Sequence, residues 1–380
     1  MLAALVAAQA VAFLVLLVRL APGARRIPPV EPSPDVVPDT SVTVIVPTLN
    51  EARRLTPCLA GLRRQGPPLA EIVVVDSAST DGTPHVVQDA ATLDARVRLL
   101  ADAPLPPGWI GKMWALQHGL AHSSGEWILG IDADVEPLPG MVAAVVSAAR
   151  MYRLDMVSFS PCFAGQSPVQ RFFHPSLALT LVYRFGAPTP KPPPSRLLAN
   201  GQCFLARRDV LLQFGGYEPA RRSFADDVTL ARHYARQGVR VGFLDGSRLY
   251  LVRSYESLGE LWREWGRSIA LSDATSARRQ ATDVIILALV QGAPLPVLLL
   301  AWFGAIDTGG VLGTAFIVLN AILLALRIGL LAAIAPSYQQ RGIPYWLSPL
   351  TDLAAVVRVA VSSVRRPRRW RGRDYSAVTS

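Results

Sequence analysis

The stretch ILGIDADVEP, Ile128–Pro137, places two aspartates directly after a short apolar run. Asp132 and Asp134 are two residues apart. Side chains alternate between the faces of a strand, so both carboxylates are expected to point the same way from the end of one buried strand. Two anions side by side in a medium of low dielectric repel each other. The sequence therefore predicts a positive partner at this strand end.

Strands and helices alternate on both sides of this stretch. SVTVIVP (41–47) and EIVVVD (71–76) are continuous apolar, β-branched runs ended by turn residues, as is typical of parallel strands covered on both faces. This rhythm predicts an α/β fold with a doubly wound sheet, in which ligands bind at the carboxyl ends of the strands. Helices are expected at Glu51–Gln65, His85–Thr92 and Trp114–His122.

The composition is that of a membrane protein with a folded, water-facing part. Hydrophobic residues make up 51% of the 380 residues, and the mean hydropathy of +0.31 is high for a soluble enzyme. The formal net charge is +10, and six arginines lie in RRPRRWRGR (Arg365–Arg373). Because this run follows apolar segments, anionic lipid headgroups are its expected partner. No RNP, zinc-finger or helix-turn-helix pattern is present, so no nucleic-acid binding is expected.

Three apolar segments predict membrane insertion. Met1–Leu20 is about long enough to cross the hydrocarbon core, and its charges follow the apolar run instead of preceding it, unlike those of a signal peptide. Val284–Phe303 and Val311–Ala335 are expected to form a transmembrane hairpin. A further crossing by Leu347–Val364 would place the basic tail outside the cell, so an interfacial or re-entrant helix is favoured there.

Polar residues also follow the first two predicted strands. Asp76 ends the second strand, where a carboxylate can accept hydrogen bonds from a nucleotide base or ribose; the alternative is an ordinary turn aspartate. The segment VIVPTLNE (Val44–Glu51) brings Pro47, Asn50 and Glu51 to the end of the first strand, beside Asp76. The alternative here is capping of the next helix by Thr48 or Asn50.

Lys112, in GWIGKMWAL, is one of only two lysines in a chain rich in arginine. Its compact ammonium group suits phosphate oxygens, and the alternative is a solvated loop lysine. A divalent cation with carboxylate and diphosphate ligands would neutralise Asp132 and Asp134 and stabilise the charge of a departing diphosphate. The alternative for these two residues is a pair of ordinary loop aspartates.

Two further acids begin an amphipathic segment, SFADDVTLARHYARQG (223–238). Either Asp226 or Asp227 can serve as the base that deprotonates a hydroxyl nucleophile. The alternative is capping of the helix and a favourable interaction with its dipole. Downstream, SYESLGELWREWGRS (254–268) supplies Arg263 and Arg267 on a second amphipathic helix.

The order of these residues resembles that of the processive-type family 2 glycosyltransferases, over about Thr40–Arg267. GWIGKMWAL, the membrane hairpin and WRGRDY (Trp370–Tyr375) resemble more specifically the bacterial membrane glycosyltransferases associated with carotenoid and hopanoid pathways. The resemblance implies a GT-A fold, which is a doubly wound, Rossmann-like mixed sheet, with transmembrane helices added to it. The family's Gln-x-x-Arg-Trp motif is not intact, because Trp262–Trp265 stands in its neighbourhood. This departure favours a single transfer over a polymerising synthase.

The resemblance also implies roles for individual residues. Asp76 would hold the base, and Asp132 and Asp134 would bind the ribose and a Mg²⁺ or Mn²⁺ on the diphosphate. Asp227 takes the place of the family's catalytic base, while Asp226 stands where glutamate is usual, so either acid is a candidate. The expected nucleotide-sugar-binding residues are Pro47, Asn50, Glu51, Asp76, Lys112, Asp132, Arg263 and Arg267.

The predicted activity is an inverting, metal-dependent transfer of a hexose from a nucleotide-diphosphate sugar, by default a UDP-sugar. The acceptor is a hydroxyl or carboxylate of a membrane-embedded lipid, with a carotenoid or related isoprenoid favoured. Ceramide-like lipids and polyprenyl phosphates are the alternative acceptors, and an inactive membrane scaffold is the alternative function.

The expected location is the cell membrane, with several crossings and a cytoplasmic catalytic domain. The expected segments are an anchor (1–22), a linker (23–39), the catalytic domain (40–250), interfacial helices (251–280), a transmembrane hairpin (281–336) and an interfacial or re-entrant helix with a basic tail (337–380).

Overall fold

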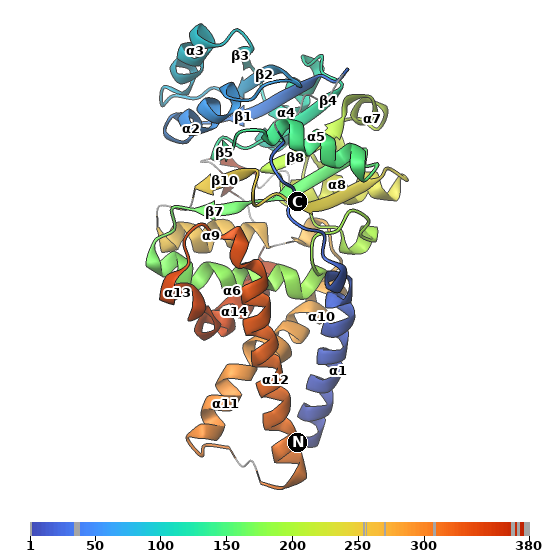
Figure 1. The fold of residues 1–380 in the computed structure, drawn as a ribbon, viewed down its shortest axis with the longest axis vertical. Coiled ribbons are helices and arrows are strands. Elements are labelled where there is room, and N and C mark those ends of the chain that lie inside the picture. Colours follow the sequence, from blue (N-terminus) through green and yellow to red (C-terminus); the bar gives the residue numbers. More distant parts are fainter. Residues whose placement is uncertain are drawn as a thin grey trace. The chain divides into compact units, whose positions relative to one another are not determined.

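A seven-stranded mixed sheet forms the centre of one of the two compact units into which the chain divides (Figure 1). The strand order is β3-β2-β1-β4-β8-β6-β9. β8 runs antiparallel to its neighbours β4 and β6, and the other neighbouring strands are parallel. The strands are β1 (Val42–Thr48), β2 (Leu69–Asp76), β3 (Val97–Ala101), β4 (Trp127–Ile131), β6 (Met156–Ser160), β8 (Cys203–Arg207) and β9 (Val241–Asp245).

The computed structural model describes residues 2–33, 39–253, 255, 257–269, 271–306, 309–365, 369–370 and 373–375. The sheet unit contains residues 27–33, 39–164 and 188–253, together with the described residues from 369 to 375. A small sheet of β5 (Val135–Pro137), β10 (Tyr250–Arg253) and β7 (Cys162–Ala164) accompanies the large one. Residues 34–38 of the expected linker lie outside the described residues.

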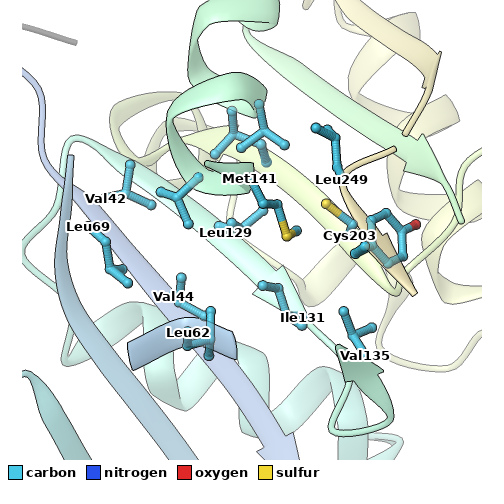
Figure 2. Packing of buried hydrophobic residues seen from close by; sticks show 14 of the residues in the cluster. Val42, Val44, Leu62, Leu69, Leu129, Ile131, Val135, Met141, Cys203 and Leu249 are labelled. Atoms are coloured by element: carbon cyan, nitrogen blue, oxygen red, sulfur yellow. The ribbon is translucent and has the colours of Figure 1, made fainter. Parts of the chain in front are cut away.

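Helices cover both faces of the seven-stranded sheet, as the continuous apolar strands predicted. Val42, Val44 and Val46 of β1 point to one core cluster, and Ile45 points to the other. Figure 2 shows residues of the first cluster, where β1 and β4 side chains meet Leu62 and Met141 from the covering helices. The helices of this unit are α2 (Ala52–Arg63), α3 (Thr83–Leu93), α4 (Gly111–Ala121), α5 (Met141–Met151), α7 (Arg208–Gln213) and α8 (Asp226–Arg236).

The other unit, here called the helical unit, is assembled from three separate stretches of chain, which lie within 1–26, 165–187 and 254–366. Its longer helices are α1 (Leu2–Leu20), α6 (Pro168–Phe185), α9 (Leu258–Ser268), α10 (Ala277–Leu287), α11 (Pro294–Trp302), α12 (Gly310–Ile334) and α14 (Asp352–Val364). A π-helical turn, η5 (Ala288–Gly292), joins α10 to α11, and the short helices α13 (Gly342–Trp346) and η7 (Ser348–Thr351) precede α14. α6 packs against α1, α13 and α14 and supplies the centre of this unit.

Three helical segments of this unit are long and apolar enough to cross a membrane: Leu2–Ala24, Ala277–Trp302 and Gly310–Ser337. They correspond to the expected anchor and hairpin. Polar groups inside the unit pair with one another instead of facing outward: Gln9 Nε2 donates to Asn320 Oδ1 (2.8 Å), and Arg19 lies 2.7 Å from Asp283. Such pairing is what apolar surroundings require of buried polar side chains.

Candidate active site

The carboxyl ends of β1, β2 and β4 meet at one edge of the large sheet. Thr48 pairs with Asp76 in the parallel register of β1 and β2, and Ile45 pairs with Gly130 of β4. β8 runs the other way, so its first residue, Cys203, lies opposite Ile131 at the same edge. This edge therefore gathers the residues after β1, β2 and β4 and those before β8.

Asp76 is held firmly at this edge. Its carboxylate accepts hydrogen bonds from Thr48 Oγ1 (3.2 Å), from Ser79 Oγ (2.5 Å) and from the Ser79 backbone N–H (3.0 Å). These hydrogen bonds are those expected of an ordinary turn aspartate, and they fix the orientation of the buried Asp76 carboxylate. A contact with a nucleotide base stays a prediction.

The loops after β1 and β2 are tied together through Asn50. Its Oδ1 accepts from the Thr80 backbone N–H (2.8 Å), and its own backbone N–H donates to Ser79 Oγ (2.8 Å). Asn50 adopts a φ of 57°, a left-handed conformation that asparagine tolerates better than most residues. Neither Thr48 nor Asn50 caps the next helix, as the alternative had it. α2 begins directly after Glu51, and its first N–H, that of Ala52, donates to the carboxylate of Asp81 (3.0 Å).

Pro47 lies half-buried within β1, one residue before that strand ends. Glu51 is buried, and its backbone N–H donates to Thr83 Oγ1 (2.9 Å). Both residues therefore belong to the framework of the same edge. Their contact with a donor nucleotide stays a prediction.

Lys112 supplies a positive partner for Asp132, the first of the two aspartates of the opening stretch. Its Nζ lies 2.7 Å from Asp132 Oδ1 and 3.7 Å from Asp226 Oδ2. Burial disfavours the ammonium form, but the carboxylates of Asp132 and Asp226 outweigh it and raise the pKa of Lys112 above its ordinary value. The lysine therefore stays charged between two acids that come from different parts of the chain, and the solvated-loop alternative is wrong.

Asp227 lies beside this cluster, as the second residue of α8. Its Oδ2 accepts from the Gly201 backbone N–H (2.9 Å), and a side chain at Gly201 would begin 2.8 Å from Lys112 Nζ. Burial and the neighbouring charge of Asp226 raise the pKa of Asp227 to about 7. A carboxyl group with a pKa near neutrality suits general base catalysis.

The strand-alternation argument for Asp132 and Asp134 needs a correction. β4 ends at Ile131, and the Val135 N–H donates to the Asp132 carbonyl oxygen (3.1 Å), so both aspartates lie in a turn. The turn, and not the alternation of a strand, sets the directions of their side chains. Both residues are half-buried, with Ala133 buried between them.

The chemistry of these two residues fits a divalent cation. Among the residues described here, no group of three or more His, Cys, Asp or Glu side chains is arranged to hold a metal ion by itself. Asp132 and Asp134 supply two hard carboxylate ligands, which suits Mg²⁺ or Mn²⁺ with water and diphosphate oxygens as the remaining ligands. A metal at this place would therefore depend on a bound diphosphate.

The structure brings together Asp132, Lys112, Asp226 and Asp227, and it places Asp76, Asn50 and Glu51 on the same sheet edge. Arg263 is exposed on α9, in the helical unit, and Arg267 Nη2 lies 2.9 Å from Glu264 of that helix. Their contact with a diphosphate stays a prediction. The sequence gives Gly201, before a short apolar strand, and Asp81, in a turn, no predicted role in the site; the contacts of both residues come from the structure.

Comparisons with known proteins agree with this geometry. Residues 43–214 match the family described as Glycosyl transferase family 2. A 4,4'-diaponeurosporenoate glycosyltransferase of Staphylococcus haemolyticus is 24% identical over 253 residues, which are 66% of this chain and 66% of the relative. A dolichyl-phosphate beta-glucosyltransferase of Trichomonas vaginalis is 39% identical over 113 residues, 27% of this chain and 32% of the relative.

One solved structure is similar over nearly the whole chain. It is a mannosyltransferase of Pyrobaculum calidifontis in complex with GDP-Man and Mn²⁺, with a TM-score of 0.56 and 25% sequence identity. The similarity covers 96% of this chain and 99% of the other. The chain thus spans about two thirds of its staphylococcal relatives and almost all of this archaeal protein.

Proposed function

We propose that the chain transfers a hexose, with inversion, from a nucleotide-diphosphate sugar to a membrane-embedded lipid, because residues 43–214 match the Glycosyl transferase family 2 model and the sheet unit has the GT-A fold. The single observation that carries this proposal is the placement of Lys112 between Asp132 and Asp226, with Asp227 beside them. This arrangement offers a cation for a leaving diphosphate and a base for an incoming hydroxyl.

The reaction is one displacement at the anomeric carbon. The oxygen of the acceptor forms a bond to that carbon, and the bond to the diphosphate oxygen breaks with its electron pair leaving on the nucleoside diphosphate. Asp227 takes the hydroxyl proton at its carboxylate, and Lys112 offers its charge to the departing phosphate oxygens. Asp132 and Asp134 would hold Mg²⁺ or Mn²⁺, which supplies further charge neutralisation when bound. One displacement inverts the configuration at the anomeric carbon.

A carotenoid or related isoprenoid is the acceptor favoured by the relatives named 4,4'-diaponeurosporenoate glycosyltransferase. The short match to a dolichyl-phosphate beta-glucosyltransferase favours a second candidate, a polyprenyl phosphate. A hydroxyl acceptor has a proton to lose, whereas a carboxylate or phosphate acceptor arrives ionised. The dependence of transfer on Asp227 therefore separates these acceptor classes.

The helical unit supports membrane residence. Between Ile343 and Val364, every exposed residue is apolar: Ile343, Trp346, Leu347, Leu350, Leu353, Val357, Val361 and Val364. Of the polar side chains in the same segment, Ser348, Thr351, Asp352 and Ser362 are buried, and Arg358 and Ser363 are half-buried. An apolar outside and a polar inside fit hydrocarbon better than water. This segment is proposed as the interfacial or re-entrant helix, with the sheet unit in the cytoplasm.

The basic run Arg365–Arg373 is proposed to contact anionic lipid headgroups. Residues 366–368 and 371–372 of this run lie outside the described residues. The charge of its six arginines and its place directly after the apolar segment support the proposal. Trypsin should cleave this run more slowly in anionic than in neutral nanodiscs carrying the full chain, and high salt should abolish the difference.

The proposed transfer is tested with the full chain in nanodiscs, given radiolabelled UDP- or GDP-hexoses and a lipid and pigment extract of the host. Mass spectrometry of the product identifies the acceptor, and the anomeric configuration of the product reports inversion. Asp227→Asn should lose transfer to a hydroxyl acceptor by at least about 10²-fold. The exposed Asp209→Asn is the matched control and should keep it. A wild-type chain that transfers no sugar to any lipid, or Asp227→Asn with full activity on an alcohol, would overturn the proposal.

A further inference from the structure

Tyr375, from the WRGRDY segment, belongs to the sheet unit although it follows the membrane helices in sequence. A short antiparallel pair, β11 (Arg369–Trp370) and β12 (Arg373–Asp374), leads directly into it. Its side chain is 4% exposed. A tyrosine this deeply buried, at the end of a two-stranded ribbon, is held by specific contacts.

The contacts of Tyr375 lie on two separate loops of the sheet unit. Its hydroxyl oxygen accepts a hydrogen bond from the Gly111 backbone N–H (3.3 Å). Its ring meets that of Phe224 edge to face, with the centroids 5.8 Å apart and the planes at 84°. Ile110 and Leu105 complete the small apolar cluster around it. The tyrosine therefore bridges the loop before α4 and the loop before α8.

Each of these loops leads into a helix whose first residues belong to the proposed catalytic cluster. Gly111 directly precedes Lys112, and Phe224 lies two residues before Asp226. The same loops are joined through the backbone by the Ile110 N–H and the Arg221 carbonyl oxygen (2.7 Å). The separation of 3.7 Å between Lys112 Nζ and Asp226 Oδ2 thus depends on how the loops are held together.

We propose that Tyr375 is a positioning residue, by which the segment after β12 clamps the N-terminus of α4, which carries Lys112, against the N-terminus of α8, which carries Asp226 and Asp227. The inference rests on the proposed function, since it concerns the same cluster. The phenol ring supplies the packing, and the hydroxyl fixes the first N–H of α4. A displacement of about 1 Å in a catalytic group can lower a rate by about 10²-fold. A small loosening of the two loops should therefore lower turnover.

Hydrogen exchange tests the clamp without any assay of transfer. In the full chain in nanodiscs, Tyr375→Ala should speed amide exchange in peptides covering 105–113 and 221–227. Tyr375→Phe should change exchange mainly in the first peptide, because it removes the acceptor of the Gly111 N–H and keeps the ring. Tyr152→Ala is the matched control, since Tyr152 packs against the other core cluster of the sheet unit. Unchanged exchange of both peptides in Tyr375→Ala would overturn the proposal.

Steady-state kinetics then tests what the clamp does. Tyr375→Ala should lower kcat about 10-fold or more while the donor KM changes less than about 3-fold, because Lys112 acts on the leaving group in the transition state. Tyr375→Phe should lose less of kcat than Tyr375→Ala, about 2- to 5-fold, because it lacks only one hydrogen bond. Tyr152→Ala should keep kcat within about 2-fold.

Three results would overturn the positioning role: kcat of Tyr375→Ala within 2-fold of wild type, an equal loss of kcat in Tyr152→Ala, or a raised donor KM at unchanged kcat. The last result would indicate direct contact with the donor. If the wild-type chain transfers no sugar, the proposed function fails, while the exchange experiment still decides whether the clamp exists.

Discussion

Arg327 and Asp352 form an ion pair in the interior of the helical unit, with Arg327 Nε 2.8 Å from Asp352 Oδ2. The side chains of the two residues are 2% and 4% exposed. Arg327 comes from the apolar α12, and Asp352 is the first residue of α14. Gln291 Nε2 also donates to Asp352 Oδ1 (2.9 Å). The pair therefore fastens α14 to α12.

Removal of one partner from this pair should destabilise the helical unit strongly. Arg327→Met or Asp352→Leu leaves an uncompensated buried charge, which typically costs about 3–5 kcal/mol. The double variant Arg327→Met/Asp352→Leu should regain most of this loss, since replacing both members of a buried pair by apolar residues is often close to neutral. Thermal unfolding in one detergent measures all three variants. Single variants with the wild-type midpoint would contradict the prediction.

Transfer to a hydroxyl acceptor should depend on pH through Asp227. The base acts when ionised, and its pKa of about 7 means that the ionised fraction rises between about pH 6 and pH 8. The rate, measured as kcat/KM, should rise over that range. Asp226→Asn removes the neighbouring negative charge that raises this pKa, so the rise of kcat/KM with pH should move to lower pH. If the rise stays at the same pH in this variant, a group other than Asp227 controls it.

Lys112 should be required for turnover more than for folding. Lys112→Met keeps the length of the side chain and removes the charge, so kcat should fall about 10²- to 10³-fold, as when one preorganised electrostatic contact is lost. Lys112→Arg places a larger, planar cation in the same gap and should recover only part of the loss. The matched control is Lys191→Met, at the second lysine of the chain. Equal activity of Lys112→Met and wild type would exclude a role at the leaving group.

Divalent metal should be required, and Asp134 should set how much is needed. Excess EDTA should abolish transfer, and added Mg²⁺ or Mn²⁺ should restore it. Asp134→Asn should need a higher metal concentration for half-maximal rate, because one of two ligand charges is lost. Metal titrations of both proteins measure the shift. Full activity of the wild type in excess chelator would contradict the metal role of Asp132 and Asp134.

The sheet was largely predictable because its signals are local. The β-branched runs that became β1 and β2 carry apolar residues toward both faces, and helices lie close to the three expected places. The direction of β8 was not predictable in this way. The chain leaves the sheet unit after Ala164 and returns only at Pro188, so no short connection fixes the strand that follows.

The sequence pointed to the residues of the candidate site but not to the contacts between them. Asp132, Lys112 and Asp227 each stood out by residue type and by position at an element end, whereas the approach of Lys112 to Asp132 depends on how α4 packs against β1 and β2. Contacts between distant parts of the sequence left no local signal. Tyr375 and Gly111 are 264 residues apart, and nothing near either residue marks the other as its partner.

The helical unit joins stretches of chain that are made at very different times. Arg19 is buried against Asp283, which is 264 residues further along, so a ribosome adding about 5–20 residues per second needs about 13–53 s to deliver the partner. During that interval Asp283 is not yet present to neutralise Arg19. The helical unit therefore cannot complete its packing until the stretch that carries Asp283 has been made, and α1 must stay without this neighbour until then.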